Sequence, residues 1–196
     1  MRRIGTLVLL GLLSGCGVGH ETVQVYYSPP TNQDVVDGAK SVSISVIGKD
    51  GRKSDRDRIS TIRNGYGRPT SIVSSGNDVV ELVRSAVERE LRLLGFKNAP
   101  GGIAVNVELR TFLITFDLHL FTADAKGEVV FDLTAIDASG GRVYSRRYRG
   151  TGFQGGVVPL TGELSKPALQ YALTNAVAEM VRDNSLRQAL VAVGRK

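Results

Sequence analysis

Apolar residues recur at every second position through the middle of the chain, and this period of two requires a β-sheet. In residues 103–114, IAVNVELRTFLI, the positions from Ile103 to Leu109 alternate between apolar and polar side chains. Successive side chains of a strand point to opposite faces, so the pattern predicts a half-buried strand. Residues 127–137 and 141–150 repeat the alternation on either side of a glycine-containing turn, which predicts a β-hairpin.

Two other segments have apolar residues spaced by three and four positions, which predicts amphipathic helices. The first is expected over residues 77–94, with Asn77 or Ser75 as its N-cap. The second is expected over residues 165–182, with Ser165 as its N-cap. A shorter amphipathic segment closes the chain.

The order of these elements predicts an α+β fold. We expect a two-layer sandwich in which two main helices pack on one face of a mostly antiparallel or mixed sheet. With 196 residues, of which 42% are hydrophobic, the chain can bury the core of one domain, placed at residues 39–196. The single cysteine excludes an intramolecular disulfide framework and any cysteine-based metal site.

The N-terminus combines a short positive stretch with a short apolar one. Arg2 and Arg3 precede the apolar residues 4–13, which are too few to cross a bilayer because a span needs about 20. This arrangement predicts a signal peptide at residues 1–15. The arginine pair could also indicate a twin-arginine signal, but its neighbours favour the general secretory route.

Residues 13–16, Leu-Ser-Gly-Cys, resemble the lipobox of bacterial prolipoproteins. The resemblance implies cleavage before Cys16, diacylglycerol on its sulfur and acylation of the new amino terminus; an ordinary secretory peptide is the alternative. Gly17 in place of Asp resembles the pattern of lipoproteins sent to the outer membrane, with the domain facing the periplasm. Residues 16–38 are polar and irregular, which predicts a lipidated Cys16 followed by a flexible tether.

The formal net charge of +6 favours anionic partners. Removal of the signal peptide, with Arg2 and Arg3, lowers this charge to about +4. Export argues against nucleic acid as a partner. Besides the membrane held through the lipid on Cys16, we expect an envelope protein or an anionic lipid to bind the domain.

A glycine-framed tyrosine is the most distinctive loop feature. In RNGYGRP, residues 63–69, two glycines flank Tyr66, so the backbone can turn sharply and present the ring at the surface. Asn64, Tyr66 and Arg68 are therefore candidate contacts for a partner. The alternative is a tight turn with Tyr66 folded back on the core.

A run of arginines and tyrosines provides the second candidate surface. Residues 142–149, RVYSRRYR, lie on a predicted strand and contribute Arg146, Arg147 and Arg149 as candidate contacts for phosphate head groups or an acidic protein face. The alternative is a solvated strand face on which arginine stems pack against tyrosine rings.

The sequence lacks a convincing catalytic pattern. Residues 150–155, GTGFQG, match G-x-G-x-x-G, but no helix follows to receive a pyrophosphate, which leaves a glycine-rich loop with tight turns. His119 lies in a strand-like stretch without a G-x-S-x-G nucleophile, so a hydrolase using His119 is a minor alternative. We predict no catalytic residue, no metal and no cofactor.

Several segments together resemble the YajG-type family of bacterial outer-membrane lipoproteins. They are the lipobox at Cys16, RNGYGRPTSIVSS, LRLLGF, VNVELRTFLI, YRGTGF and ALTNAVAEMVRDNSLRQAL. The resemblance implies a small α/β module of the cell envelope without enzymatic activity. We therefore expect a membrane-anchored lipoprotein with a non-enzymatic binding or scaffolding domain; the alternative is an auxiliary subunit of a lipid or envelope transport system.

Overall fold

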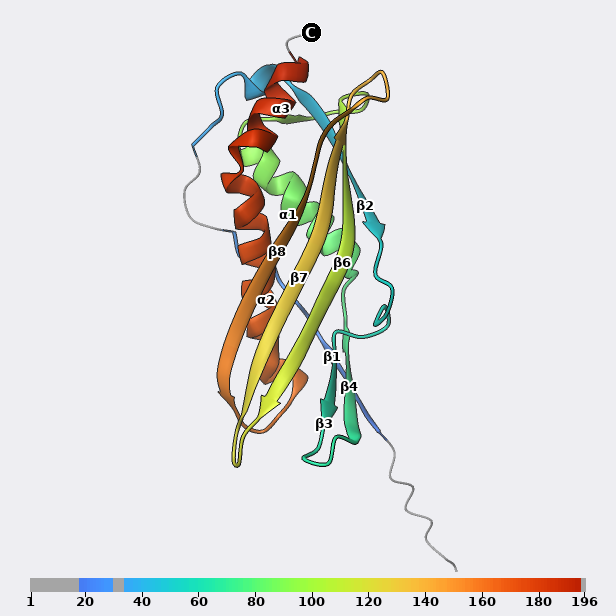
Figure 1. Ribbon diagram of the computed structural model, residues 1–196, viewed down its shortest axis with the longest axis vertical. Coiled ribbons are helices and arrows are strands. Elements are labelled where there is room, and N and C mark those ends of the chain that lie inside the picture. Colours follow the sequence, from blue (N-terminus) through green and yellow to red (C-terminus); the bar gives the residue numbers. More distant parts are fainter. Residues whose placement is uncertain (1–17, 30–33, 195–196) are drawn as a thin grey trace, which may run out of the picture.

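The structure is a computed structural model that describes residues 18–29 and 34–194 (Figure 1). The signal peptide predicted for residues 1–15 and the lipid site predicted at Cys16 lie outside these ranges. The helices are α1 (Val79–Leu93), α2 (Gly162–Arg182) and α3 (Asn184–Gly194), with a 3-10 turn, η1, at Ala39–Ser41. The strands are β1 (Gly19–Val23), β2 (Ser43–Asp50), β3 (Ser60–Arg63), β4 (Pro69–Ser75), β5 (Lys97–Asn98), β6 (Ile103–Leu118), β7 (Ala123–Ile136) and β8 (Arg142–Val157).

The described strands form two sheets. The larger has the order β5-β2-β6-β7-β8, in which β6, β7 and β8 run antiparallel to one another and β2 runs parallel to β6. The smaller has the order β1-β4-β3, with β1 parallel to β4. The predicted hairpin is confirmed as β7 and β8, and the mixed character of the sheet is confirmed as well.

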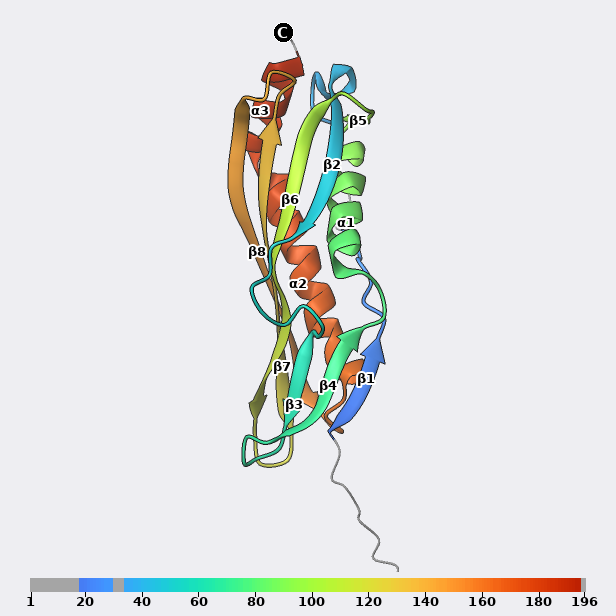
Figure 2. The ribbon, with the colours of Figure 1, turned by 90° about the vertical axis from the view of Figure 1, so that its right-hand side faces the viewer.

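Both long helices cover the same face of the larger sheet, which confirms the predicted α+β sandwich (Figure 2). The apolar positions of β6 from Ile103 to Leu109 are buried on this face, because α1 lies over β2 and β6 while α2 lies over β7 and β8. The helix starts differ from the predictions. The N-cap of α1 is Asp78, and the N-cap of α2 is Thr161, four residues before the predicted Ser165. Ser165 Oγ instead donates to Thr161 O inside the first turn.

Helix α2 packs directly on the backbone of β7 and β8 at three glycines, Gly127, Gly150 and Gly152. A Cβ built on Gly150 would lie 2.0 Å from Ala172 O, and one built on Gly152 would lie 2.0 Å from Ala168 O. The prediction that GTGFQG forms a turn-rich loop is therefore wrong, because these residues belong to β8 and their missing side chains make room for the helix.

We predict that Gly152→Ala lowers the free energy of unfolding by about 1–3 kcal/mol, because the added methyl forces α2 away from the sheet. Urea denaturation at neutral pH measures this change. Gly65→Ala is the matched control, since a methyl there meets nothing within 4 Å. Equal stability of the two variants would contradict the close packing.

The segment predicted as a flexible tether is in part an ordered strand. β1 pairs with β4, Glu21 Oε2 accepts a hydrogen bond of 2.6 Å from Gly162 N, and Val23 and Val25 are buried. Tyr27 continues their period of two, and its hydroxyl donates to Glu90 on α1. The prediction of a flexible tether is thus wrong for residues 19–27. Their apolar residues alternate with polar ones, and this pattern indicates a strand.

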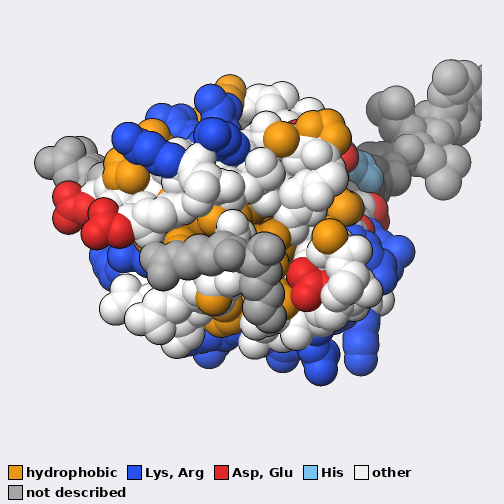
Figure 3. Space-filling model, turned by 90° about the horizontal axis from the view of Figure 1, so that it is seen from above, with side chains coloured by type: hydrophobic (Ala, Val, Ile, Leu, Met, Phe, Trp, Pro, Cys, Tyr) orange, Lys and Arg blue, Asp and Glu red, His pale blue; other side chains and the backbone are white. Residues whose placement is uncertain are grey.

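The elongated domain has two distinct ends. The β3–β4 loop, the β6–β7 turn, the β8–α2 connection and the start of β1 all lie at the lower end in Figures 1 and 2. The upper end carries α3, and the view from above shows lysine and arginine side chains around the outline of the molecule with apolar side chains between them (Figure 3). Among the helices of the described ranges, none combines the length and apolarity that crossing a bilayer requires.

Candidate functional site

The sheet face opposite α1 and α2 carries a row of alternating charges, here named the charged ladder, which crosses four neighbouring strands. Arg110 links Glu108 at 2.8 Å to Asp132 at 2.7 Å, and Asp132 accepts from Arg147 Nε at 2.7 Å. Lys49 on β2 extends the row to Glu108 at 3.7 Å. The ladder therefore orders cations and anions of β2, β6, β7 and β8 on one surface.

The charged ladder is partly solvated. The hydrogen bond from Arg147 lowers the pKa of Asp132 below its usual range, with help from Arg110 and against the effect of burial. The side chain of Arg147 is 63% exposed. Because exposed ion pairs contribute only about 0–1 kcal/mol each, the ladder does little for stability and mainly fixes the positions of surface charges.

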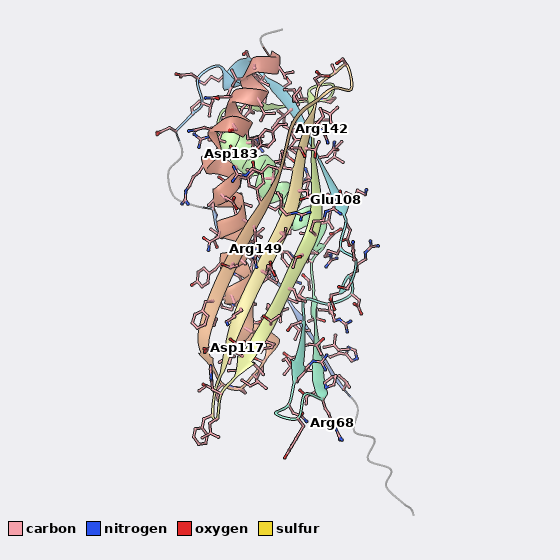
Figure 4. All side chains as sticks on the ribbon, viewed as in Figure 1. Arg68, Glu108, Asp117, Arg142, Arg149 and Asp183 are labelled. Carbon is pink, nitrogen blue, oxygen red and sulfur yellow. The ribbon has the colours of Figure 1, made fainter. Side chains whose placement is uncertain are left out.

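A hollow of about 660 Å³ lies beside the ladder on the same face, toward the lower end. Arg149 and Glu128 form an ion pair of 2.7 Å in its lining, and Leu113, Phe153 and Tyr171 supply apolar lining. Figure 4 shows Arg149 and Glu108 along the sheet. The volume falls within the range of about 300–1,000 Å³ that is usual for ligand sites.

Helix α2 closes part of the free edge of β8 beside this hollow. Glu179 Oε2 accepts from Arg149 N at 3.1 Å, and Asn175 Nδ2 donates to Thr151 O at 2.8 Å. Side chains that satisfy an edge strand in this way discourage unwanted strand addition. They also give the border of the hollow a fixed shape.

The three predicted arginine contacts do not form one patch. Successive side chains of a strand alternate, so Arg147 and Arg149 lie on the open face while Arg146 lies on the helix-covered face. Arg146 binds Asp183 at 2.8 Å and Glu179 at 3.2 Å, and its guanidinium lies 5.5 Å from the centre of the Tyr148 ring. Arg146 thus has the arrangement of the alternative prediction, an arginine packed on a tyrosine.

Asp183 is the centre of a buried polar cluster that the sequence analysis did not identify. Its Oδ2 accepts from the hydroxyls of Tyr144 and Tyr148, and its Oδ1 accepts from the first backbone N–H groups of α3. Burial alone would raise the pKa of Asp183, but the two tyrosine hydroxyls and the backbone N–H groups lower it to about 2. The cluster joins β8 to the α2–α3 junction and has a structural role.

We predict that Asp183→Asn flattens the acid limb of the stability curve. The folded-state pKa of about 2 lies below the ordinary value of 3.8, so the carboxylate stabilises the fold above about pH 4 and this contribution is lost as pH falls toward 2. It amounts to about 2 kcal/mol. Urea denaturation at pH 7 and pH 2.5 should show a smaller difference between the two pH values for the variant; an unchanged difference would refute the assignment.

The β3–β4 loop presents Tyr66 as predicted, with its side chain 92% exposed, so the alternative of a ring folded onto the core is wrong. Asn64 Oδ1 accepts from Tyr66 N at 3.0 Å and from Arg68 N at 3.1 Å. Gly67 takes a φ of +77°, which glycine adopts readily. Asn64 therefore shapes the loop, and Tyr66 and Arg68 point outward.

His119 lies in the exposed β6–β7 turn, because β6 ends at Leu118. Its Nε2 lies 3.0 Å from Asp124 Oδ2, and this hydrogen bond, with another from Gly156 N, lowers the pKa of Asp124. Within the described ranges, no group of three or more His, Cys, Asp and Glu side chains is arranged to hold a metal ion.

Residues 29–191 match the model of a family described as uncharacterized lipoprotein. No curated protein matches the chain. The fold is similar to a crystal structure of a DUF330 protein from Xanthomonas campestris, with a TM-score of 0.56 and 13% identity over 85% of this chain and 95% of that one. An uncharacterized protein gives a TM-score of 0.51 with 8% identity over 85% and 98% of the two chains.

A minor lipoprotein from Acinetobacter baumannii is also similar, with a TM-score of 0.45 and 9% identity over 79% of this chain and 95% of that one. At these identities, the two neighbours with TM-scores above 0.5 show a shared fold and nothing about a ligand.

Proposed function

The chain belongs to a family of uncharacterized lipoproteins, and we propose that it holds a non-enzymatic binding domain at the periplasmic face of the outer membrane. The lipid would be attached to Cys16, and Gly17 after it supports the outer membrane, as does the resemblance to the YajG-type family. The partner is an envelope protein that binds the open face of the larger sheet.

The open sheet face is the observation that carries this proposal. It is covered by neither long helix, it carries the ordered charges of the ladder, and it contains the hollow beside Arg149. Apolar lining surrounded by charges of both signs suits a protein interface, where an apolar centre has a polar rim. His119, the candidate for catalysis, does not line the hollow.

The first experiment places a photocrosslinking amino acid at Thr151, an exposed position in the lining of the hollow. We predict a discrete crosslinked product with an envelope protein in living cells. The same amino acid at Arg92, exposed on α1, is the control and should give no such product. Equal products from both positions, or none from Thr151, would refute the proposed face.

The contribution of Arg149 can be separated from that of its ion pair. Arg149→Glu should weaken the crosslink several-fold, and the double variant Glu128→Arg with Arg149→Glu restores an ion pair with reversed polarity. If the crosslink of the double variant stays weak, the partner contacts the positive charge at position 149 directly. Full recovery would mean that the pair only supports the strand surface.

The hollow also supports a second candidate, an auxiliary subunit of a lipid or envelope transport system. Leu113, Phe153 and Tyr171 could contact an acyl chain while Arg149 faces an acidic head group. Mass spectrometry of the purified protein distinguishes the two functions, because this candidate requires a specific lipid that is lost on Arg149→Glu.

A further inference from the structure

We propose that the lower end of the domain rests on the bilayer, with the β3–β4 loop and the β6–β7 turn in contact with its head groups. This inference depends on the lipid anchor at Cys16, which belongs to the proposed function. It adds an orientation: the domain stands on one end and does not swing on a long tether.

The position of β1 limits the distance between domain and membrane. Gly19 pairs with Ser71, two residues after β4 begins at Pro69, and so lies beside the β3–β4 loop. Two residues, Gly17 and Val18, lie between Cys16 and Gly19, and an extended chain spans at most about 3.6 Å per step, so the three steps cover at most about 11 Å. A lipid on Cys16 therefore holds the lower end against the membrane surface.

Exposed apolar side chains gather at this end. Among the described residues, the three large apolar side chains with the greatest exposure are Tyr66 at 92%, Leu120 at 86% and Phe121 at 83%. Tyr66 lies in the β3–β4 loop, and the other two form the β6–β7 turn, at the same level in both ribbon views (Figures 1 and 2). Tyrosine is enriched at membrane interfaces, and leucine and phenylalanine insert among head groups.

The charges of the lower end are complementary to anionic head groups. Arg63 and Arg68 flank Tyr66 and make no ion pair within the described ranges. Arg63 Nη1 donates to Gly67 O at 2.9 Å, and Arg68 lies at the lower end of the domain in Figure 4. The nearby carboxylates are engaged within the domain: Asp117 with Lys126, Asp124 with His119, and Glu21 with the backbone N–H of Gly162. Two cations without an ion pair thus lie beside Tyr66, where anionic head groups would meet them in the proposed orientation.

A bilayer is the occupant that these observations favour. The exposed apolar residues belong to two separate loops, the β3–β4 loop and the β6–β7 turn, and do not line one groove. Because the two loops lie at the same level, both can contact one flat surface at the same time. Their covalent neighbour, three residues before β1, is the predicted lipid-bearing cysteine. A protein partner bound at these tips is the competing outcome of the experiment.

The chain has no tryptophan, so one indole introduced at a tip reports its own surroundings. Lipidated Phe121→Trp protein is reconstituted into vesicles of phosphatidylethanolamine and phosphatidylglycerol with brominated acyl chains. We predict a blue shift of the emission and loss of most of the fluorescence. Leu93→Trp is the matched control, half-exposed at the upper end of α1, and should keep its fluorescence.

Flotation of the same samples separates this inference from the anchor. Protein that floats with the vesicles while the indole at position 121 stays unquenched retains its anchor but overturns the orientation. Protein that fails to float overturns both the anchor and the orientation. Equal quenching of the two variants would mean that the domain lies flat, which also contradicts the proposal.

Discussion

At three glycines helix α2 lies directly on the backbone of β7 and β8, and this contact determines the arrangement of the domain. Gly127, Gly150 and Gly152 leave no Cβ in the path of the helix, and alanines of α2 face them. Close packing of this kind permits little sliding, because displacement by a methyl group already creates overlaps. The helix therefore packs on the sheet in one position, and its two ends have defined places.

Hydrogen bonds at both ends of α2 attach other parts of the chain to the helix. At its start, the backbone N–H of Gly162 binds Glu21 of β1, and farther along Thr174 Oγ1 donates to Ser28 O. At its end, Asp183 receives the hydroxyls of Tyr144 and Tyr148 and caps α3. The segment leading from Cys16 and the C-terminal helix are thus attached through the same element. This explains why the N-terminal segment is a strand and not a spacer.

The sequence was sufficient for the main elements and their layers, because periods of two and of three to four report which face of an element is buried. It failed where contacts depend on the pairing of distant segments. β1 is a strand because it pairs with β4, where Gly19 lies opposite Ser71, far along the chain. GTGFQG is a strand that leaves room for a helix, and this is visible only once Ala168 and Ala172 of α2 are placed on it. For the candidate site, the exposure of Tyr66 followed from the glycines on either side of it. The alternation of side chains along a strand is also a local rule, and it places Arg146 on the opposite face of β8 from Arg147 and Arg149.

In the proposed orientation, the anchored end and the open face together set the height at which a partner would bind. Strands rise about 3.3 Å per residue, so Leu113 in the hollow lies about 17 Å above Leu118 at the end of β6, and Glu108 in the charged ladder about 33 Å. A domain that stands on its lower end keeps both surfaces clear of the head groups. A partner with a folded domain in the periplasm can then reach the hollow from the side, whereas a domain lying flat would turn the same surfaces toward or away from the membrane. An upright orientation therefore leaves the open face accessible along the whole length of β6, which suits its proposed use as a binding surface.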